Sequence, residues 1–137
     1  MPTVRYVEYN DASPEVRAIY DEIMFVRTLD FVPNFYKALA SHPATLRRFW
    51  ENLKTVIASR RIDPLMQELI AIAVCSVTNC SYCIASHMKA ARTLGMDDEM
   101  LGELLSIVSV FSDTSRLAAG YQMELDPQFA EANLNHV

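Results

Sequence analysis

Apolar residues recur along this chain at the three- and four-residue spacing of amphipathic helices, and several such stretches begin with proline. Proline suits the first helical position because its missing N–H would have no partner there. Ser13-Pro14 opens the first stretch, and Phe31-Val32-Pro33 interrupts the pattern. The spacing therefore predicts a helix from Pro14, a short helix over 34–40, and a third helix that begins at Pro43.

The second half of the chain shows the same organisation with clearer boundary signals. Asp63-Pro64 is a strong pair for the N-cap and first helical position, and Gly95 has the position of a residue that ends a helix. The predicted helices here are 64–77, 81–94, a helix capped by Asp97-Asp98 that runs through Val108, and 112–125. Strand signals are weak, although residues 4–9 can form a short extended arm. The pattern predicts one all-α domain, residues 1–137, built as a bundle of about six helices.

Composition narrows the class of protein. The chain has 137 residues, of which 51% are hydrophobic and 21% charged, so it can bury a core and is not intrinsically disordered. Three glycines are too few for an all-β fold or for a glycine-rich phosphate loop. A net charge of −5 argues against nucleic acid and anionic membrane surfaces as partners.

The compartment and the assembly are also predicted from the sequence. The segment 1–10 has no apolar signal region, and the chain has no run of eighteen apolar residues. We therefore expect a cytoplasmic protein with no membrane contact, in which paired cysteines serve redox or metal chemistry. Apolar and methionine positions exceed what one small core requires, which predicts a homo-oligomer. The alternative is that the methionines fill gaps in the core.

One segment carries the candidate chemistry, the run from Cys80 to His87 with Tyr82 and Cys83 between them. If a helix begins near Cys80, spacings of three and four residues place Cys80, Cys83 and His87 on one face. Two thiols three residues apart can close a disulfide, and a helix N-terminus favours thiolate over thiol. His87 can carry a proton near neutral pH. The segment thus offers a nucleophile, a resolving thiol and a proton carrier.

Glu68 is the candidate carboxylate for the same site. It shares a helix face with Ile72 and Cys75, and most of its neighbours are apolar. A partly buried carboxylate must be neutral, paired or hydrogen-bonded. Because the two helices meet at Asn79, Glu68 and His87 can approach as the helices fold back on each other. A carboxylate on a solvated helix face is the alternative.

The remaining alternatives concern the use of the cysteines. A metal site can be built from Cys80, Cys83 and His87 with Glu68 or Cys75 as the fourth ligand. Another alternative is a helical oligomer without catalytic activity, in which the CxxC pair is a relic or a sensor. Cys75 itself is predicted to be a small buried apolar residue.

Three other side chains could contribute polar groups to the site, namely Tyr82, His42 and His136. Tyr82 is expected to combine packing with a hydroxyl donor. His42 and His136 have no partners at useful spacing and are predicted to be structural or surface residues.

The combination of glutamate, eleven residues, CxxC, three residues and histidine resembles the AhpD-like alkylhydroperoxidases of the carboxymuconolactone decarboxylase superfamily. The resemblance covers about residues 33–110 and includes FVPNFYKAL and ELIAIAV, which are similar to the peroxidase-related branch. It implies an all-helical fold that assembles into trimers, hexamers or related oligomers. The decarboxylase branch typically lacks the CxxC pair, so the resemblance favours peroxidase chemistry.

The resemblance also implies a role for each residue. Cys83 matches the cysteine that attacks peroxide and becomes a sulfenic acid, and Cys80 matches the resolving cysteine and proton donor. Glu68 and His87 match the proton relay. Tyr82 stands where some AhpD enzymes have a second histidine, which leaves a hydroxyl in place of an imidazole.

The expected activity is therefore that of a dithiol peroxidase, with a peroxide as substrate and a thiol reductant or redox partner protein as electron donor. No flavin or nicotinamide motif is present, and the route needs no metal or organic cofactor. A general thiol-disulfide oxidoreductase is the nearest alternative. Helix-dipole reasoning alone favours Cys80 as the thiol of lower pKa. The family match favours Cys83, which lies one turn from His87.

Overall fold

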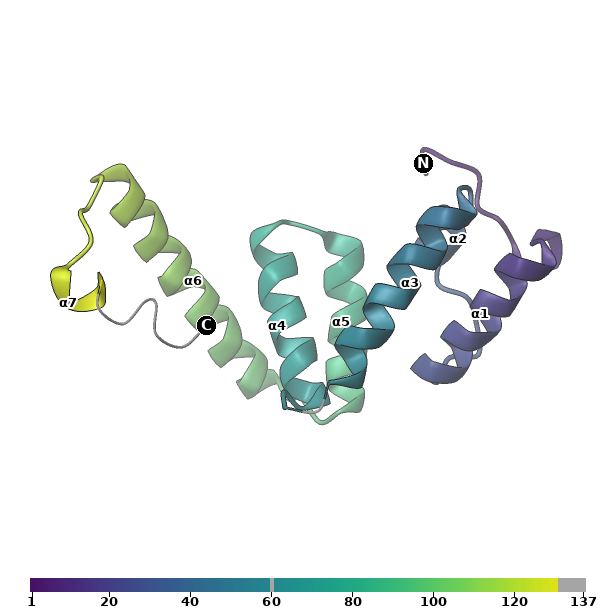
Figure 1. The fold of residues 1–137 in the computed structure, drawn as a ribbon. Coiled ribbons are helices and arrows are strands. Elements are labelled where there is room, and N and C mark those ends of the chain that lie inside the picture. The colour runs from purple at the N-terminus through teal and green to yellow at the C-terminus, as the bar shows by residue number, and fades with distance from the viewer. Residues whose placement is uncertain (60, 131–137) are drawn as a thin grey trace. The chain divides into compact units, whose positions relative to one another are not determined.

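The computed structural model describes residues 1–59 and 61–130, and this part of the chain contains helices but no strand (Figure 1). The elements are a 3₁₀ turn η1 (Tyr9–Asp11) and helices α1 (Pro14–Arg27), α2 (Asn34–Leu39), α3 (Pro43–Ala58), α4 (Pro64–Val77), α5 (Ser81–Thr93), α6 (Asp98–Gly120) and α7 (Pro127–Ala130). The all-α prediction is confirmed. The described residues form two compact units, with the division at Arg61 and Ile62, and their assignment to one domain stays a prediction.

Local capping explains where the helices start. Ser13 Oγ accepts a hydrogen bond from the Val16 amide at 3.3 Å at the start of α1. Asp63 Oδ1 does the same for the Met66 amide at 3.0 Å in α4, and α1, α3 and α4 each have proline in the first turn. Each such cap contributes about 1 kcal/mol. These starts agree with the predicted ones because the capping signal is local.

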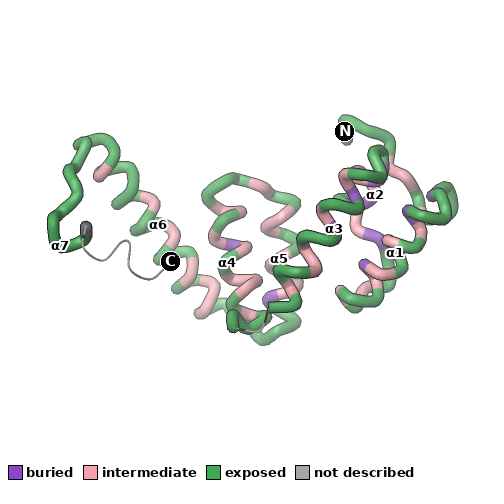
Figure 2. Tube along the Cα trace, in the orientation of Figure 1, coloured by how far each residue is buried: buried purple, intermediate pink, exposed green. Residues whose placement is uncertain are grey.

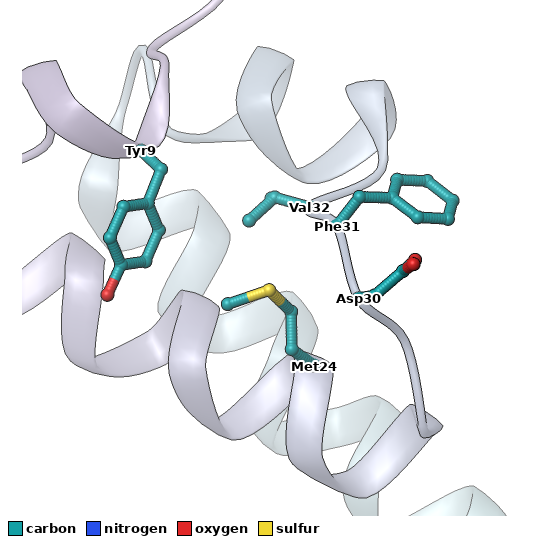
Figure 3. Close-up of a pocket in the computed structure, with 5 residues that line it drawn as sticks. All are labelled: Tyr9, Met24, Asp30, Phe31 and Val32. Carbon is teal, nitrogen blue, oxygen red and sulfur yellow. The ribbon is translucent and has the colours of Figure 1, made fainter.

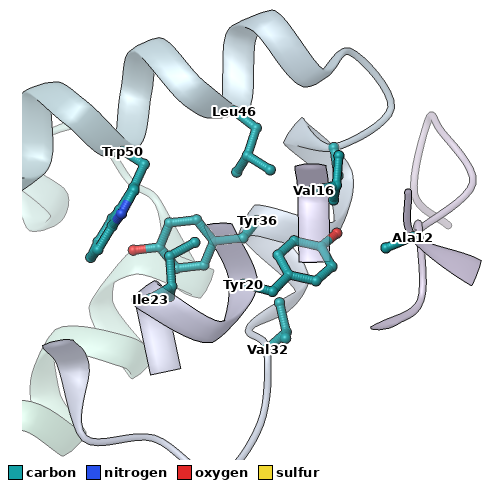
Figure 4. Close-up of a cluster of buried hydrophobic side chains, with 9 residues drawn as sticks. Ala12, Val16, Tyr20, Ile23, Val32, Tyr36, Leu46 and Trp50 are labelled. Carbon is teal, nitrogen blue, oxygen red and sulfur yellow. The ribbon is translucent and has the colours of Figure 1, made fainter. Parts of the chain in front are cut away.

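The first unit encloses an apolar core between α1, α2 and α3. Tyr20, Ile23, Leu46 and Trp50 are fully buried, and Figure 4 shows them facing one another with Tyr36. Figure 2 shows the buried positions of this unit along the same helices. Burying each large side chain contributes about 1.5–3 kcal/mol, so these few residues account for much of the unit's stability.

Polar contacts tie the edges of this core. The Tyr20 hydroxyl donates to the Val7 carbonyl at 2.9 Å, and the Val7 amide donates to the Lys37 carbonyl at 3.1 Å, which fixes the N-terminal arm. Trp50 Nε1 donates to Glu22 Oε2 at 2.8 Å, and Lys54 Nζ donates to Glu22 Oε1 at 2.9 Å. Hydrogen bonds from Lys54 and Trp50 lower the pKa of Glu22 below its ordinary value.

A surface pocket of about 260 Å³ lies in the first unit, lined by Tyr9, Met24, Asp30, Phe31 and Val32 (Figure 3). Its lining holds neither cysteine nor histidine. The pocket therefore offers none of the thiol chemistry that the sequence predicts.

The second unit is organised around the α4–α5 hairpin. The two helices pack side by side, and α6 packs against α4 (Figure 1). Ile72 of α4 and Ala91 of α5 are buried together with Met96, and Leu69 and Met88 pack against them. This small core fixes α5 against α4 and so positions the candidate site.

The C-terminal helices differ from the prediction. Two helices, one through Val108 and one over 112–125, were expected, but α6 runs without a break over Asp98–Gly120 and α7 follows it. Serine and threonine near a helix start suggest a cap, yet inside a continuous helix their hydroxyls can bond the carbonyl four residues back. Thr114 Oγ1 donates in this way to the Val110 carbonyl at 2.9 Å. The predicted break near Ser112 was therefore wrong.

Among the residues that the structure describes, no helix has both the length and the apolar character needed to cross a bilayer.

Candidate active site

The turn between α4 and α5 places Cys80 at the junction of the two helices. Asn79 has a positive φ of 57°, and the Cys80 amide then donates back to the Cys75 carbonyl at 3.1 Å. Cys80 is also the N-cap of α5, and its carbonyl accepts from the Ile84 amide at 2.9 Å. The Cys80 backbone thus makes the bond that closes the turn after α4, and the same residue caps α5.

Cys80 and Cys83 are joined by a disulfide, with their Cα atoms 5.3 Å apart. The Cys83 amide donates to Cys80 Sγ at 3.3 Å, so a sulfur has the capping position that oxygen usually has. Both residues are half-buried, and Cys75 is a half-buried free thiol. The structure therefore brings together the two cysteines that the sequence paired, at the positive end of α5.

Glu68 and His87 meet across the hairpin. His87 Nδ1 lies 2.7 Å from Glu68 Oε2, and the side chains are 29% and 15% exposed. The expected approach of these two residues is confirmed, and it gives the partly buried carboxylate the partner it needs. Because an ionised carboxylate only accepts hydrogen bonds, this contact requires the proton on Nδ1 and makes Nε2 the acceptor nitrogen of the neutral ring.

The structure also shows the wider set of candidate residues. Tyr82 lies in the first turn of α5 with 47% of its surface exposed, and Cys75 lies in the last turn of α4. His42 precedes α3, where its Nδ1 lies 2.9 Å from Thr45 Oγ1, as expected of a structural histidine. His136 lies outside the described residues.

Two features bear on the alternatives. Within 1–59 and 61–130, no three histidine, cysteine, aspartate or glutamate side chains are grouped as metal ligands. The two cysteine sulfurs that a metal site on the CxxC pair would need are bonded to each other in this structure.

The backbone of Asn79 was not predicted. The sequence indicated only that the two helices meet at this residue, and its left-handed conformation was missed, although asparagine after an apolar helix is a signal for it.

Known proteins are similar to this chain in sequence and in structure. Residues 43–123 match the Carboxymuconolactone decarboxylase family. Over 56 residues the chain is 38% identical to "Uncharacterized protein 4 in cox locus" of Paracoccus denitrificans, a match that covers 41% of this chain and 50% of that protein. Over 64 residues it is 31% identical to alkyl hydroperoxide reductase AhpD of Mycobacterium tuberculosis, covering 47% and 36% respectively. The matched segments thus span half or less of these curated relatives.

A solved structure matches almost the whole chain. The alkylhydroperoxidase AhpD core from Rhodospirillum rubrum superimposes with a TM-score of 0.89 at 39% sequence identity, covering 95% of this chain and 98% of that one. Identity and coverage at this level support a common helical fold across the described helices.

Proposed function

We propose that this chain, which belongs to the carboxymuconolactone decarboxylase family, is a dithiol peroxidase that reduces hydroperoxides through Cys83 and Cys80. The observation that carries the proposal is the Cys80–Cys83 disulfide at the start of α5, with a Glu68–His87 pair one turn further along that helix. The names of the AhpD relatives support a hydroperoxide as substrate.

The oxidative half-reaction starts from the dithiol. The Cys83 thiolate attacks the terminal oxygen of a hydroperoxide, the O–O bond breaks, and the alkoxide takes a proton and leaves as an alcohol. Cys83 is then a sulfenic acid. The Cys80 sulfur attacks the Cys83 sulfur, the S–O bond breaks, and water leaves as the disulfide forms. Two electrons have passed from the two sulfurs to the peroxide.

His87 is the proton carrier in this scheme. It lies four residues after Cys83 on the same helix, so its ring and the Cys83 sulfur share a face. Nδ1 faces Glu68 at 2.7 Å, and Nε2 takes the Cys83 proton and delivers a proton to the departing oxygen. Glu68 orients the ring through this contact. The expected effect of such a relay is about 10²–10⁴-fold in rate.

The reductive half-reaction needs an external thiol. The Cys83 amide already donates to Cys80 Sγ, which stabilises negative charge on that sulfur and makes Cys80 the better leaving group. The incoming thiolate therefore attacks Cys83, and the S–S bond breaks to release Cys80. A second thiol of the donor then resolves the mixed disulfide and restores the dithiol. The donor is a dithiol of a partner protein or two molecules of a small thiol.

A homo-oligomer is part of the proposal. Helix α6 has no buried residue among its 23, and large apolar side chains along it are more than half exposed. They are Ile107, Val110, Phe111 and Leu117. Contiguous exposed apolar surface favours burial against another chain. Light scattering on the purified protein tests this, and a monomer at micromolar concentration would contradict it.

Hydroperoxide consumption tests the proposed activity. The reduced protein is mixed with cumene hydroperoxide and either dithiothreitol or glutathione, and the wild type is compared with Cys83→Ser. Cys75→Ser is the matched control because it removes the thiol that lies outside the disulfide. Turnover lost only in Cys83→Ser supports the peroxidase. Exchange of disulfides without peroxide turnover would instead indicate a general thiol-disulfide oxidoreductase, and zinc bound stoichiometrically to the dithiol would indicate a metal site.

A further inference from the structure

Four helices of the described chain end in the same way. A residue with positive φ follows the last turn, and the amide of the next residue donates to the carbonyl five residues earlier. The positive-φ residues and the closing bonds are Thr28 with Leu29 N–Met24 O at 2.9 Å, Asn79 with Cys80 N–Cys75 O at 3.1 Å, Gly95 with Met96 N–Ala91 O at 3.0 Å, and Gln122 with Met123 N–Ala118 O at 3.1 Å. The C-terminal motif of α4 therefore recurs at three other helix ends of the described chain.

At the end of α4, the residue that donates the closing bond of this motif is also a residue of the candidate site. The residue after Asn79 is Cys80, and all three of its polar groups are engaged within the turn. Its amide bonds Cys75, its sulfur accepts from the Cys83 amide, and its carbonyl accepts from the Ile84 amide. The backbone angle at Asn79 therefore decides the direction in which the chain enters Cys80.

We propose that Asn79 is a positioning residue for the Cys80–Cys83 couple. Its left-handed conformation holds the Cys80 sulfur at the N-terminus of α5, within reach of Cys83, in both the oxidised and the reduced protein. Asparagine and glycine adopt this conformation readily, whereas most other residues resist it. The inference rests on the proposed function in that it treats the couple as redox-active.

The position of the dithiol–disulfide equilibrium follows from this role. A residue that resists φ near 57° weakens the bond from Cys80 to Cys75 and lets Cys80 move away from Cys83. The effective concentration of one thiol at the other then falls, and the dithiol becomes favoured over the disulfide. Glycine retains the left-handed backbone and should retain the equilibrium.

The test is equilibration of the whole chain with reduced and oxidised glutathione, followed by alkylation and mass spectrometry of the peptide with Cys80 and Cys83. Asn79→Ala should lower the equilibrium constant for disulfide formation by about threefold or more, since alanine resists the left-handed region. Asn79→Gly should stay within about twofold of the wild type. A threefold change corresponds to about 14 mV in this two-electron couple.

Gln122→Ala is the matched control because it removes a non-glycine residue with φ 52° from the same motif at the end of α6. Both alanine variants should lower the thermal midpoint, and only Asn79→Ala should change the thiol equilibrium. An unchanged equilibrium in folded Asn79→Ala overturns the inference, and so does a change of equal size in Gln122→Ala or in Asn79→Gly. Should Asn79→Ala fail to fold, Asn79→Ser decides in its place: a smaller shift toward dithiol supports the role, and no shift overturns it.

This experiment contains no peroxide, which separates its failure from that of the proposed function. A wild-type protein that consumes no hydroperoxide overturns the peroxidase proposal alone. If the protein is an active peroxidase but substitutions at residue 79 do not change the thiol equilibrium, the positioning role alone is overturned.

Discussion

His87 Nδ1 lies 2.7 Å from Glu68 Oε2, and this contact joins α5 to α4 across the hairpin that carries the two bonded cysteines. The Glu68 side chain is only 15% exposed, and a partly buried ion pair adds little net stability over an apolar pair of the same volume. A carboxylate at this position is therefore better explained by chemistry than by stability.

The first prediction concerns this pair. Glu68→Gln and His87→Ala should each slow oxidation of the dithiol by hydroperoxide by roughly 10²–10⁴-fold, the range of general acid–base groups. Glutamine removes the carboxylate that orients the ring, and alanine removes the proton carrier. Stopped-flow measurement of the reduced protein with cumene hydroperoxide gives the rates, and circular dichroism verifies the fold.

His42→Ala is the control for the histidine because its ring contacts the hydroxyl of Thr45 at the start of α3, in the other compact unit. It should leave the rate unchanged. Wild-type rates in both Glu68→Gln and His87→Ala between about pH 6 and 9, on either side of an ordinary histidine pKa, would show that the relay is wrong.

Sequence reasoning predicted the parts of the site that depend on local signals. The caps at Ser13 and Asp63 act within one turn, so the helix starts could be predicted. The meeting of Glu68 and His87 followed from two helices that reverse at Asn79. The spacing of a CxxC pair at a helix start likewise indicated which sulfurs lie close.

The rest depends on choices that the local sequence leaves open. Thr114 can cap a new helix or bond back to Val110, and the structure has the second arrangement within one long α6. Asn79 can extend a helix turn or adopt the left-handed backbone, and only the closing bond from Cys80 to Cys75 shows which. Tertiary packing selects between these local conformations, and the packing cannot be predicted from the local sequence alone.

The second prediction concerns the order of the two cysteines. Cys80→Ser should leave a sulfenic acid on Cys83 that dimedone traps after one equivalent of peroxide, because nothing resolves it. Cys83→Ser should trap nothing, since in the proposed scheme Cys80 only resolves the sulfenic acid that forms on Cys83. Peptide mass spectrometry locates the label. Dimedone on Cys80 in Cys83→Ser, with none on Cys83 in Cys80→Ser, would reverse the assignment.

The third prediction concerns the third thiol. Cys75 should remain reduced through peroxide treatment that closes the Cys80–Cys83 bridge, because its thiol lies in the last turn of α4 rather than at the start of α5. Mapping of disulfides after mild oxidation checks this. A dominant bridge between Cys75 and Cys80 would be incompatible with the proposed couple.

The fourth prediction concerns acid stability of the first unit. Hydrogen bonds from Lys54 and Trp50 hold the pKa of Glu22 below its ordinary value of 4.5. A lowered pKa in the fold contributes stability above pH 4.5 that is lost as the pH falls through the folded value. Because Glu22 is partly exposed, the contribution is that of a screened surface pair.

Urea unfolding followed by fluorescence of Trp50, the sole tryptophan, measures this effect between about pH 7 and 3, the range that spans carboxylate titration. Glu22→Gln should be less stable than the wild type at pH 7, and the difference should shrink in acid. Glu124→Gln is the control, since its carboxylate lies in the second unit beyond α6. Equal pH slopes for Glu22→Gln and the wild type would refute the assigned role of the Glu22 contacts.

The central claim is that Cys83 and Cys80 pass two electrons to a hydroperoxide, and a single turnover tests it most directly. The fully reduced protein receives one equivalent of cumene hydroperoxide with no reductant, and the alcohol and the protein mass are measured together. The account predicts one alcohol per chain and the loss of two hydrogens from the peptide with Cys80 and Cys83, with neither change in Cys83→Ser. Hydroperoxide that persists beside an intact dithiol would contradict the account.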